Sequence, residues 1–171
     1  MKTFGLVGWS GSGKTTLMVK LLPELIGRGL SVSTMKHTHH DVDIDRPGKD
    51  SYEHRRAGAR EVMLASGSRW SLVHELGAES EPDLDSLVAR MTPVDLLLVE
   101  GFKRQGHDKI EIHRPVLGQE FLYLQDENIV AIASDAPVRD VSLPVLDLHD
   151  VSGIGEFIIK HCGLKAAGSH G

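Results

Sequence analysis

The chain has 171 residues, of which 40% are hydrophobic and 25% are charged, and its formal net charge is −5. This size suits a domain with a sizeable core, and the acidic balance lacks the basic footprint of a general nucleic-acid binder. No apolar run approaches the roughly 18 residues of a membrane span, and the single cysteine excludes an intrachain disulfide. We expect one domain over residues 1–165, a disordered tail over 166–171, no signal peptide and a cytoplasmic location.

The run 8–15, with the sequence GWSGSGKT, matches the phosphate-binding loop G-x-x-x-x-G-K-[ST]. An apolar stretch at 4–7 predicts a buried strand before it, and residues 16–22 predict a helix after it. Its glycines permit positive φ angles and a close approach to a ligand, and its N–H groups can form an anion nest at the helix N-terminus. The residues expected to bind nucleotide here are Gly8, Ser10, Gly11, Ser12, Gly13, Lys14, Thr15 and Thr16.

Within this loop, two side chains have distinct expected roles. Lys14 is expected to reach the β- and γ-phosphates as a point charge, and the Thr15 hydroxyl is expected to ligate Mg²⁺. A chance glycine-rich turn before a helix is the plain alternative, and the intact motif with the correct flanks weighs against it.

The rest of the chain alternates predicted strands and helices. In chain order we expect a helix over 13–27, a strand over 30–36, a polar loop over 37–50, a short helix over 51–58 capped by Ser51 or Asp50, a hairpin of 61–65 with 68–75, and a short helix over 83–91. The continuous apolar run within 95–101 predicts a central parallel strand. Residues 109–113 alternate apolar and polar, which predicts a half-exposed or edge strand.

Strands over 128–133 and 145–148 and a closing helix over 151–160 complete this pattern. It predicts an α/β fold of the P-loop NTPase-like, three-layer kind: a mostly parallel sheet with helices on both faces, plus a β-hairpin extension. Ligands in such folds sit at the carboxyl ends of the strands.

Glu100 directly follows the apolar run 96–99, so it stands where a phosphate-binding loop needs a carboxylate for Mg²⁺. It would either ligate the metal or orient and deprotonate a water, and a merely solvated strand-end glutamate is the plain alternative. With Lys14 it is the candidate catalytic residue, and with Thr15 the candidate metal ligand. No glutamine stands in a switch position like that of signalling GTPases, so we expect slow hydrolysis at best.

Asp135 follows the predicted strand 128–133. In GTPases an aspartate after a late strand accepts hydrogen bonds from guanine N1–H and the exocyclic amine. The full Asn-Lys-x-Asp signature is absent here, so a turn or helix-capping role before Pro137 is an equal alternative.

The segment 36–45 is rich in histidine and aspartate and follows the second predicted strand. It permits a transition-metal site, a site for Mg²⁺-phosphate or an anionic substrate, or a solvated polar loop. The spacing of its histidines does not match that of a zinc finger. A site for Mg²⁺-phosphate or an anionic substrate is favoured by the positive charge of Lys36, His37, Lys49 and Arg55.

These blocks together closely resemble the MobB family, small P-loop proteins of molybdopterin-guanine dinucleotide biosynthesis. The resemblance lies in the phosphate-binding loop, KHTHH at 36–40, PGKDSY at 47–52, Arg55, AGA at 57–59 and VEGFK at 99–103. It runs from the first strand to Asp135 and is thinner in the acidic loop and the last 25 or so residues.

The resemblance implies GTP binding with Mg²⁺, slow hydrolysis and a homodimer. It also implies an adapter role beside the MobA-like guanylyltransferase that joins GMP to molybdopterin, and leaves open whether molybdopterin itself binds. Carried over, residues 8–16 would hold the phosphates and Glu100 would act at Mg²⁺. An adjoining anionic pocket would be lined by Lys36, His37, His39, His40, Lys49, Arg55 and Lys103.

Other classes of protein share parts of this pattern. Nucleoside and nucleotide kinases have the same loop and a similar size, but they carry an arginine-rich lid that this sequence lacks. A metallochaperone GTPase is suggested by the 10 histidines, although most of them are scattered outside the segment 36–45.

Overall fold

The computed structural model describes residues 1–38, 45–103 and 105–165. Two compact units make up the chain, Met1–His37 with Met91–Gly171 and Thr38–Arg90. The tail expected to be disordered lies outside the described residues, and the single domain expected over 1–165 stays a prediction.

The larger unit is built on a parallel sheet. Its strands are β1 (Lys2–Val7), β2 (Val32–Lys36), β5 (Leu96–Glu100), β6 (Lys109–His113), β7 (Ile129–Ser134) and β8 (Val145–Asp147), in the order β2-β5-β1-β6-β7-β8. Each adjacent pair in this order is parallel, so all the carboxyl ends meet at one edge. The sheet confirms the predicted α/β class and the central place of β5, whose residues are all buried.

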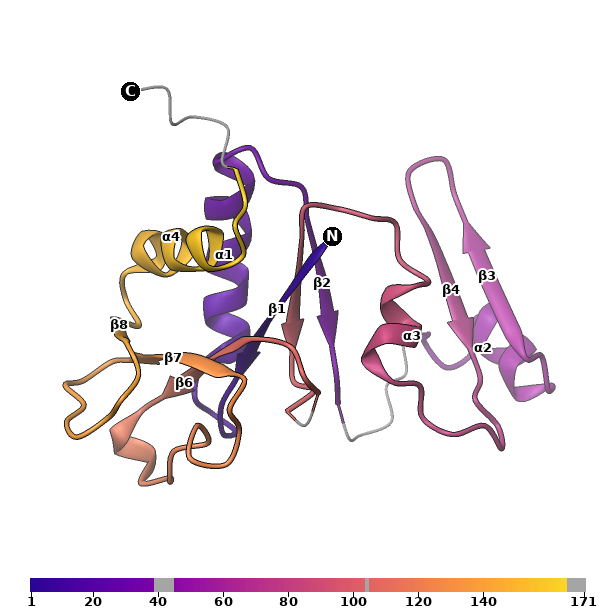
Figure 1. The fold of residues 1–171 in the computed structure, drawn as a ribbon. Helices are drawn as coiled ribbons and strands as arrows, with labels where there is room; N and C mark the ends of the chain where they lie inside the picture. Colours follow the sequence, from indigo (N-terminus) through magenta and orange to yellow (C-terminus); the bar gives the residue numbers. More distant parts are fainter. Residues whose placement is uncertain (39–44, 104, 166–171) are drawn as a thin grey trace. The chain divides into compact units, whose positions relative to one another are not determined.

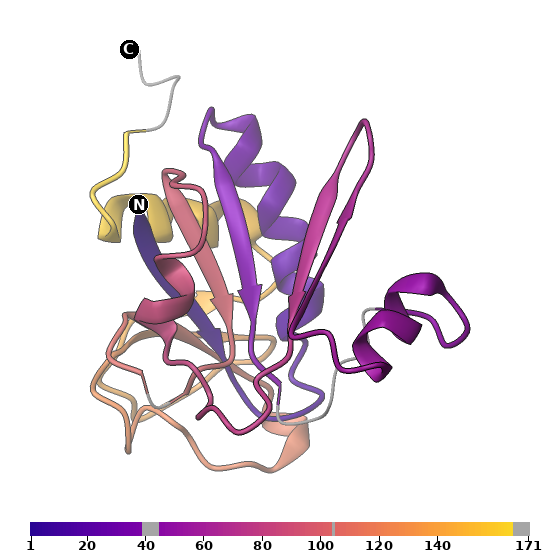
Figure 2. The ribbon, with the colours of Figure 1, turned by 90° about the vertical axis from the view of Figure 1, so that its right-hand side faces the viewer.

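Helices α1 (Lys14–Gly27) and α4 (Val151–His161) pack against each other on one face of this sheet (Figure 2). On α1 the buried residues include Leu17, Leu21 and Leu25, at the helical spacing that the sequence predicted. They join one core cluster with sheet residues such as Phe4 and Leu98. No helix in the described ranges is long and apolar enough to cross a membrane.

The prediction that residues 109–113 form a half-exposed or edge strand is wrong. Strand β6 lies between β1 and β7 and is buried at every residue. Its polar side chains Lys109 and Glu111 are buried because the segment before the strand and the connection to β7 satisfy them. The Lys109 ammonium donates to Gln105 O at 2.8 Å and Asp126 Oδ2 at 2.9 Å, and the Glu111 carboxylate accepts the N–H groups of Leu122 at 2.9 Å and Tyr123 at 3.0 Å. The alternation of apolar and polar residues in β6 therefore reflects buried polar groups with hydrogen-bond partners and not a solvent-exposed face.

The smaller unit contains α2 (Asp50–Arg56), the antiparallel hairpin of β3 (Glu61–Ala65) and β4 (Trp70–His74), and α3 (Leu84–Val88) (Figure 1). The hairpin is confirmed. The cap expected at Ser51 or Asp50 is wrong, because the N-cap of α2 is Lys49, without a side-chain cap bond. Asp50 instead lies in the first helical turn, where a negative charge favours the helix dipole.

The burial of His107 predicts that the stability of the larger unit depends on pH. Its ring nitrogens are buried without a hydrogen-bond partner among the described residues. Burial, aided by the nearby Lys109 charge, lowers the pKa of His107 from 6.5 to about 4. At His107 the unfolded chain is therefore expected to bind more protons than the folded one between these values, so the contribution of this residue to stability is full above pH 6.5 and falls as the pH drops towards 4.

Replacing His107 with glutamine, which does not titrate, is expected to flatten this part of the stability profile. The slope removed cannot exceed about 1.4 kcal/mol per pH unit, the value for one proton. Urea unfolding of both proteins at several pH values measures it. Parallel profiles for the wild type and the variant would show that His107 does not carry the effect.

Candidate functional site

The segment between β1 and α1 folds as a tight loop at the carboxyl edge of the sheet. Gly8 has φ of 154°, and a Cβ there would lie 2.5 Å from Ile112 O and 2.6 Å from Ser12 Oγ, so only glycine fits. Gly11 and Gly13 also have positive φ, 77° and 96°. The loop thus has the backbone form that the motif predicted.

The Ser12 hydroxyl is a buried polar group of the loop that lacks a hydrogen-bond partner among the described residues. The residue is 1% exposed, yet within the described part of the chain Ser12 Oγ has no hydrogen-bond partner. A buried hydroxyl in this state is costly. A phosphate oxygen seated in the loop would accept its hydrogen bond, so the residues present fit a bound phosphate group.

Lys14 folds back over the loop that precedes it. Its ammonium donates to Gly8 O at 3.0 Å and Trp9 O at 2.9 Å. Burial lowers the pKa of Lys14, and the charges of Lys103 and Lys36 lower it further, while Glu100 opposes them. Among the described residues, the cations of Lys14, Lys36 and Lys103 thus share one region with the Glu100 carboxylate, which gives the site a field that attracts a polyanion.

Glu100 lies at the end of β5, beside β1 in the sheet. The Thr15 hydroxyl donates to both of its carboxylate oxygens, Oε1 and Oε2, at 3.0 Å, and Lys36 Nζ lies 3.1 Å from Oε1. Hydroxyl and carboxylate oxygens are the hard donors that Mg²⁺ prefers, and the Lys36 ammonium already lies against this carboxylate. The donor set fits Mg²⁺; that Thr15 and Glu100 hold it stays a prediction.

Residues after β2 and β5 close this part of the site. The His37 N–H donates to Glu100 O at 2.8 Å, and the His37 ring centre lies 4.5 Å from that of Phe102. Gly101, with φ of 97°, lets the chain turn here, since a Cβ would meet His37 Cβ at 3.1 Å. Lys103 Nζ then lies 4.9 Å from the centre of the Trp9 ring, so the 99–103 block reaches back to the phosphate loop.

The contact of Trp9 with Glu120 was not foreseen from the sequence. Trp9 Nε1 donates to Glu120 O at 2.8 Å, across 111 positions of sequence. The segment that carries Glu120 is held in turn by the buried Glu111 carboxylate through Leu122 and Tyr123. The position of Trp9 in the phosphate loop therefore depends on the β6–β7 connection, and no local sequence motif predicts this contact.

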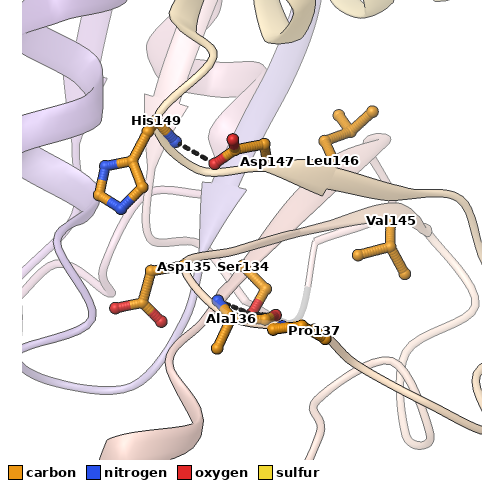
Figure 3. Close-up of a pocket in the computed structure, with 8 residues that line it drawn as sticks. All are labelled: Ser134, Asp135, Ala136, Pro137, Val145, Leu146, Asp147 and His149. Carbon is orange, nitrogen blue, oxygen red and sulfur yellow. Dashed lines mark hydrogen bonds between the residues drawn. The ribbon is translucent and has the colours of Figure 1, made fainter.

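A pocket of about 360 Å³ lies at the carboxyl ends of β7 and β8. Figure 3 shows the Asp135 carboxylate and the His149 ring on the same side of the two chain segments. Asp135 Oδ2 accepts a hydrogen bond from Arg114 Nε at 2.6 Å, which holds the carboxylate in place. The remaining lining residues are Ser134, Ala136, Pro137, Val145, Leu146 and Asp147.

The remaining predicted site residues belong to the smaller unit, to the phosphate loop and α1, or to a segment outside the described residues. Lys49 and Arg55 belong to the smaller unit, where Arg55 pairs with Asp45 at 2.9 Å and Glu75 at 2.7 Å. His39 and His40 lie outside the described residues. Ser10 and Thr16 are exposed parts of the phosphate loop and the first turn of α1. Across residues 1–38, 45–103 and 105–165, no cluster of three or more histidine, cysteine or acidic side chains is arranged to hold a metal.

Comparison with known proteins yields a consistent family. The family described as molybdopterin guanine dinucleotide synthesis protein B, MobB, matches residues 3–135, the same extent as the resemblance seen in the sequence. The chain is 48% identical over 157 residues to the molybdopterin-guanine dinucleotide biosynthesis adapter protein of Escherichia coli K12, covering 89% of this chain and 88% of that protein. It is 39% identical to the adapter protein of Haemophilus influenzae Rd, covering 90% and 85%.

Solved structures agree with the sequence matches. The crystal structure of a molybdopterin-guanine biosynthesis protein B superposes with a TM-score of 0.73 at 28% identity, covering 93% of this chain and 99% of that one. The phosphate loop, the carboxylate at the end of β5 and these matches lead to one conclusion: the chain belongs to the MobB family.

Proposed function

We propose that this chain is a GTP-binding adapter in the conversion of molybdopterin to molybdopterin guanine dinucleotide. Its relatives are named as adapter proteins of that biosynthesis. The observation that carries the nucleotide part is the contact of Thr15 with Glu100 at 3.0 Å beside the phosphate loop, since it joins a phosphate nest to an oxygen site for a divalent cation. On binding, Lys14 leaves the carbonyls of Gly8 and Trp9 for the β- and γ-phosphates.

In this proposal Thr15 and Glu100 would hold Mg²⁺, which would supply positive charge to the terminal phosphates. Lys36 and Lys103 add positive charge at the same edge of the sheet, and His37 supports Glu100 through its backbone. We expect hydrolysis to be slow at best. Bound GTP would then act as a ligand that stays in the site or as a signal that partner proteins recognise.

The pocket beside Asp135 is proposed to take the guanine base. Strand β7 follows β6 in the sheet, and β6 lies beside β1, so this pocket and the phosphate loop lie at the carboxyl edge of one sheet. The Asp135 oxygen not engaged by Arg114 is available to accept hydrogen bonds from guanine N1–H or the 2-amino group. A purine fits the volume, and the His149 ring offers a surface for stacking.

A homodimer is proposed to use the hairpin of the smaller unit. Met63 pairs with Leu72 and Ala65 with Trp70, so these side chains share a face. Met63 is 62%, Trp70 68% and Leu72 43% exposed, and a two-stranded sheet is marginal alone. A second copy of this chain would cover this apolar face. The further partners proposed are a MobA-like guanylyltransferase and molybdopterin, in the cytoplasm.

Replacing Asp135 with asparagine tests the base pocket. Affinity for GTP is expected to fall about ten- to a hundredfold, the usual worth of a hydrogen bond to a charged group. Affinity for xanthosine triphosphate is expected to rise, because xanthine presents a 2-carbonyl to the new amide donor. Calorimetry with both nucleotides and with inorganic tripolyphosphate measures the changes, and tripolyphosphate affinity is expected to stay constant.

Asp147 provides a matched control in the same pocket. Its Oδ1 accepts the His149 N–H at 2.8 Å, a bond that an asparagine oxygen retains. Asp147→Asn is therefore expected to leave the preference for GTP over xanthosine triphosphate nearly unchanged. Unaltered GTP affinity in Asp135→Asn would place the base elsewhere.

A further inference from the structure

Lys36 and Glu100 form an ion pair inside the proposed nucleotide site. They are register partners on the adjacent parallel strands β2 and β5, and Lys36 Nζ lies 3.1 Å from Glu100 Oε1. The Glu100 side chain is 10% exposed, whereas that of Lys36 is 60% exposed. A largely buried carboxylate thus has its charge balanced by a cation at the end of a flexible, solvated stem.

The position of this ammonium is the important feature. The Thr15 hydroxyl contacts Glu100 Oε1 and Oε2 at 3.0 Å, so Lys36, which lies against Oε1, approaches the oxygen set that suits Mg²⁺. An ammonium and a divalent cation cannot both lie against Glu100 Oε1 without strong repulsion. Occupation by one therefore requires the departure of the other.

We propose that Lys36 is a tethered stand-in for the divalent cation, paired with Glu100 while the metal is absent and displaced when the metal enters. This inference rests on the proposed function, because that function assigns a divalent cation to Glu100. The exchange keeps Glu100 compensated throughout, which avoids the cost of an unpaired buried charge. The displaced ammonium remains at the carboxyl edge of the sheet with Lys14 and Lys103, where it can face the terminal phosphates.

A purely structural ion pair makes a different prediction. An ion pair that only stabilises the fold does not compete with a metal, so its removal would leave metal affinity unchanged or weaken it through disorder of Glu100. A stand-in cation is a competitor. Its removal must tighten the metal site.

The test uses Mn²⁺ as the probe, titrated into the nucleotide-free full chain and followed by water-proton relaxation. Lys36→Met, which keeps the stem and removes the charge, is expected to bind Mn²⁺ roughly two- to fivefold more tightly than the wild type, the worth of a partly exposed ion pair. Lys36→Arg keeps a cation beside Glu100 and is expected to match the wild type. Lys103→Met removes a nearby charge that lies over Trp9, and is expected to change Mn²⁺ affinity less than Lys36→Met.

Glu100→Gln identifies the site that the signal reports, because it is expected to abolish the tight Mn²⁺ binding. Equal Mn²⁺ affinity in the wild type and Lys36→Met would overturn the inference, as would binding retained in Glu100→Gln. Calorimetry with GTP on the same proteins keeps the two proposals separate. A wild type that binds no GTP would contradict the proposed function, while the Mn²⁺ series would still decide the role of Lys36.

Discussion

Replacing Lys14 with alanine is expected to abolish measurable GTP binding and leave the fold intact. The Lys14 ammonium contacts only the loop carbonyls of Gly8 and Trp9 among its described hydrogen bonds, so its removal costs the core nothing. Toward a triphosphate it would make charge-assisted bonds. Losing a charged contact of this kind is expected to weaken GTP at least about a hundredfold, measured by isothermal calorimetry.

Lys20 supplies the matched control for that experiment. It lies on the exposed side of the same helix, α1, so Lys20→Ala removes an equal charge away from the loop and is expected to retain wild-type affinity. Urea unfolding of both variants checks the fold. Wild-type GTP affinity in Lys14→Ala would show that the loop does not bind the phosphates.

Replacing Glu100 with glutamine is expected to remove the Mg²⁺-dependent part of GTP binding. The amide keeps the shape of the side chain and an oxygen for the Thr15 hydroxyl, but it loses the charge that a divalent cation requires. Affinity in Mg²⁺ is expected to fall about ten- to a hundredfold, while affinity with the metal chelated changes little. Paired titrations in Mg²⁺ and in chelator measure the difference.

The residue before β5 gives the comparison for that variant. Asp95 stands at the opposite end of the strand, where its Oδ2 accepts Ser31 N–H at 2.8 Å and Ser31 Oγ–H at 2.6 Å. Asp95→Asn is expected to leave the Mg²⁺ dependence intact, whatever it does to stability. A loss in Glu100→Gln that is equal with and without Mg²⁺ would contradict a metal role.

The sequence predicted the elements whose chemistry is local. The loop 8–15 carries its glycines, lysine and threonine in one run, so its position between strand and helix could be read directly. The strand before Glu100 is apolar at each step because it is buried on both faces. These two signals were sufficient to place Lys14, Thr15 and Glu100 together.

The features that the sequence missed depend on partners far along the chain. Strand β6 alternates like a surface strand, but Lys109 and Glu111 are buried because they find partners in the segment before the strand and in the connection to β7. The Arg114–Asp135 pair and the Trp9–Glu120 bond likewise join segments with no shared motif. The N-cap of α2 falls on Lys49, a residue without capping chemistry, so propensity alone pointed to its neighbours.

The two tryptophans lie in different units, so each can serve as a fluorescent probe of its own unit. The sequence holds 2 tryptophans: Trp9 lies in the phosphate loop under the Lys103 cation, and Trp70 lies on the hairpin strand β4. One conservative substitution to phenylalanine therefore leaves a single tryptophan, whose fluorescence reports either on events at the phosphate loop or on events at the hairpin. The emission of an unlabelled sample can follow each half of the molecule independently.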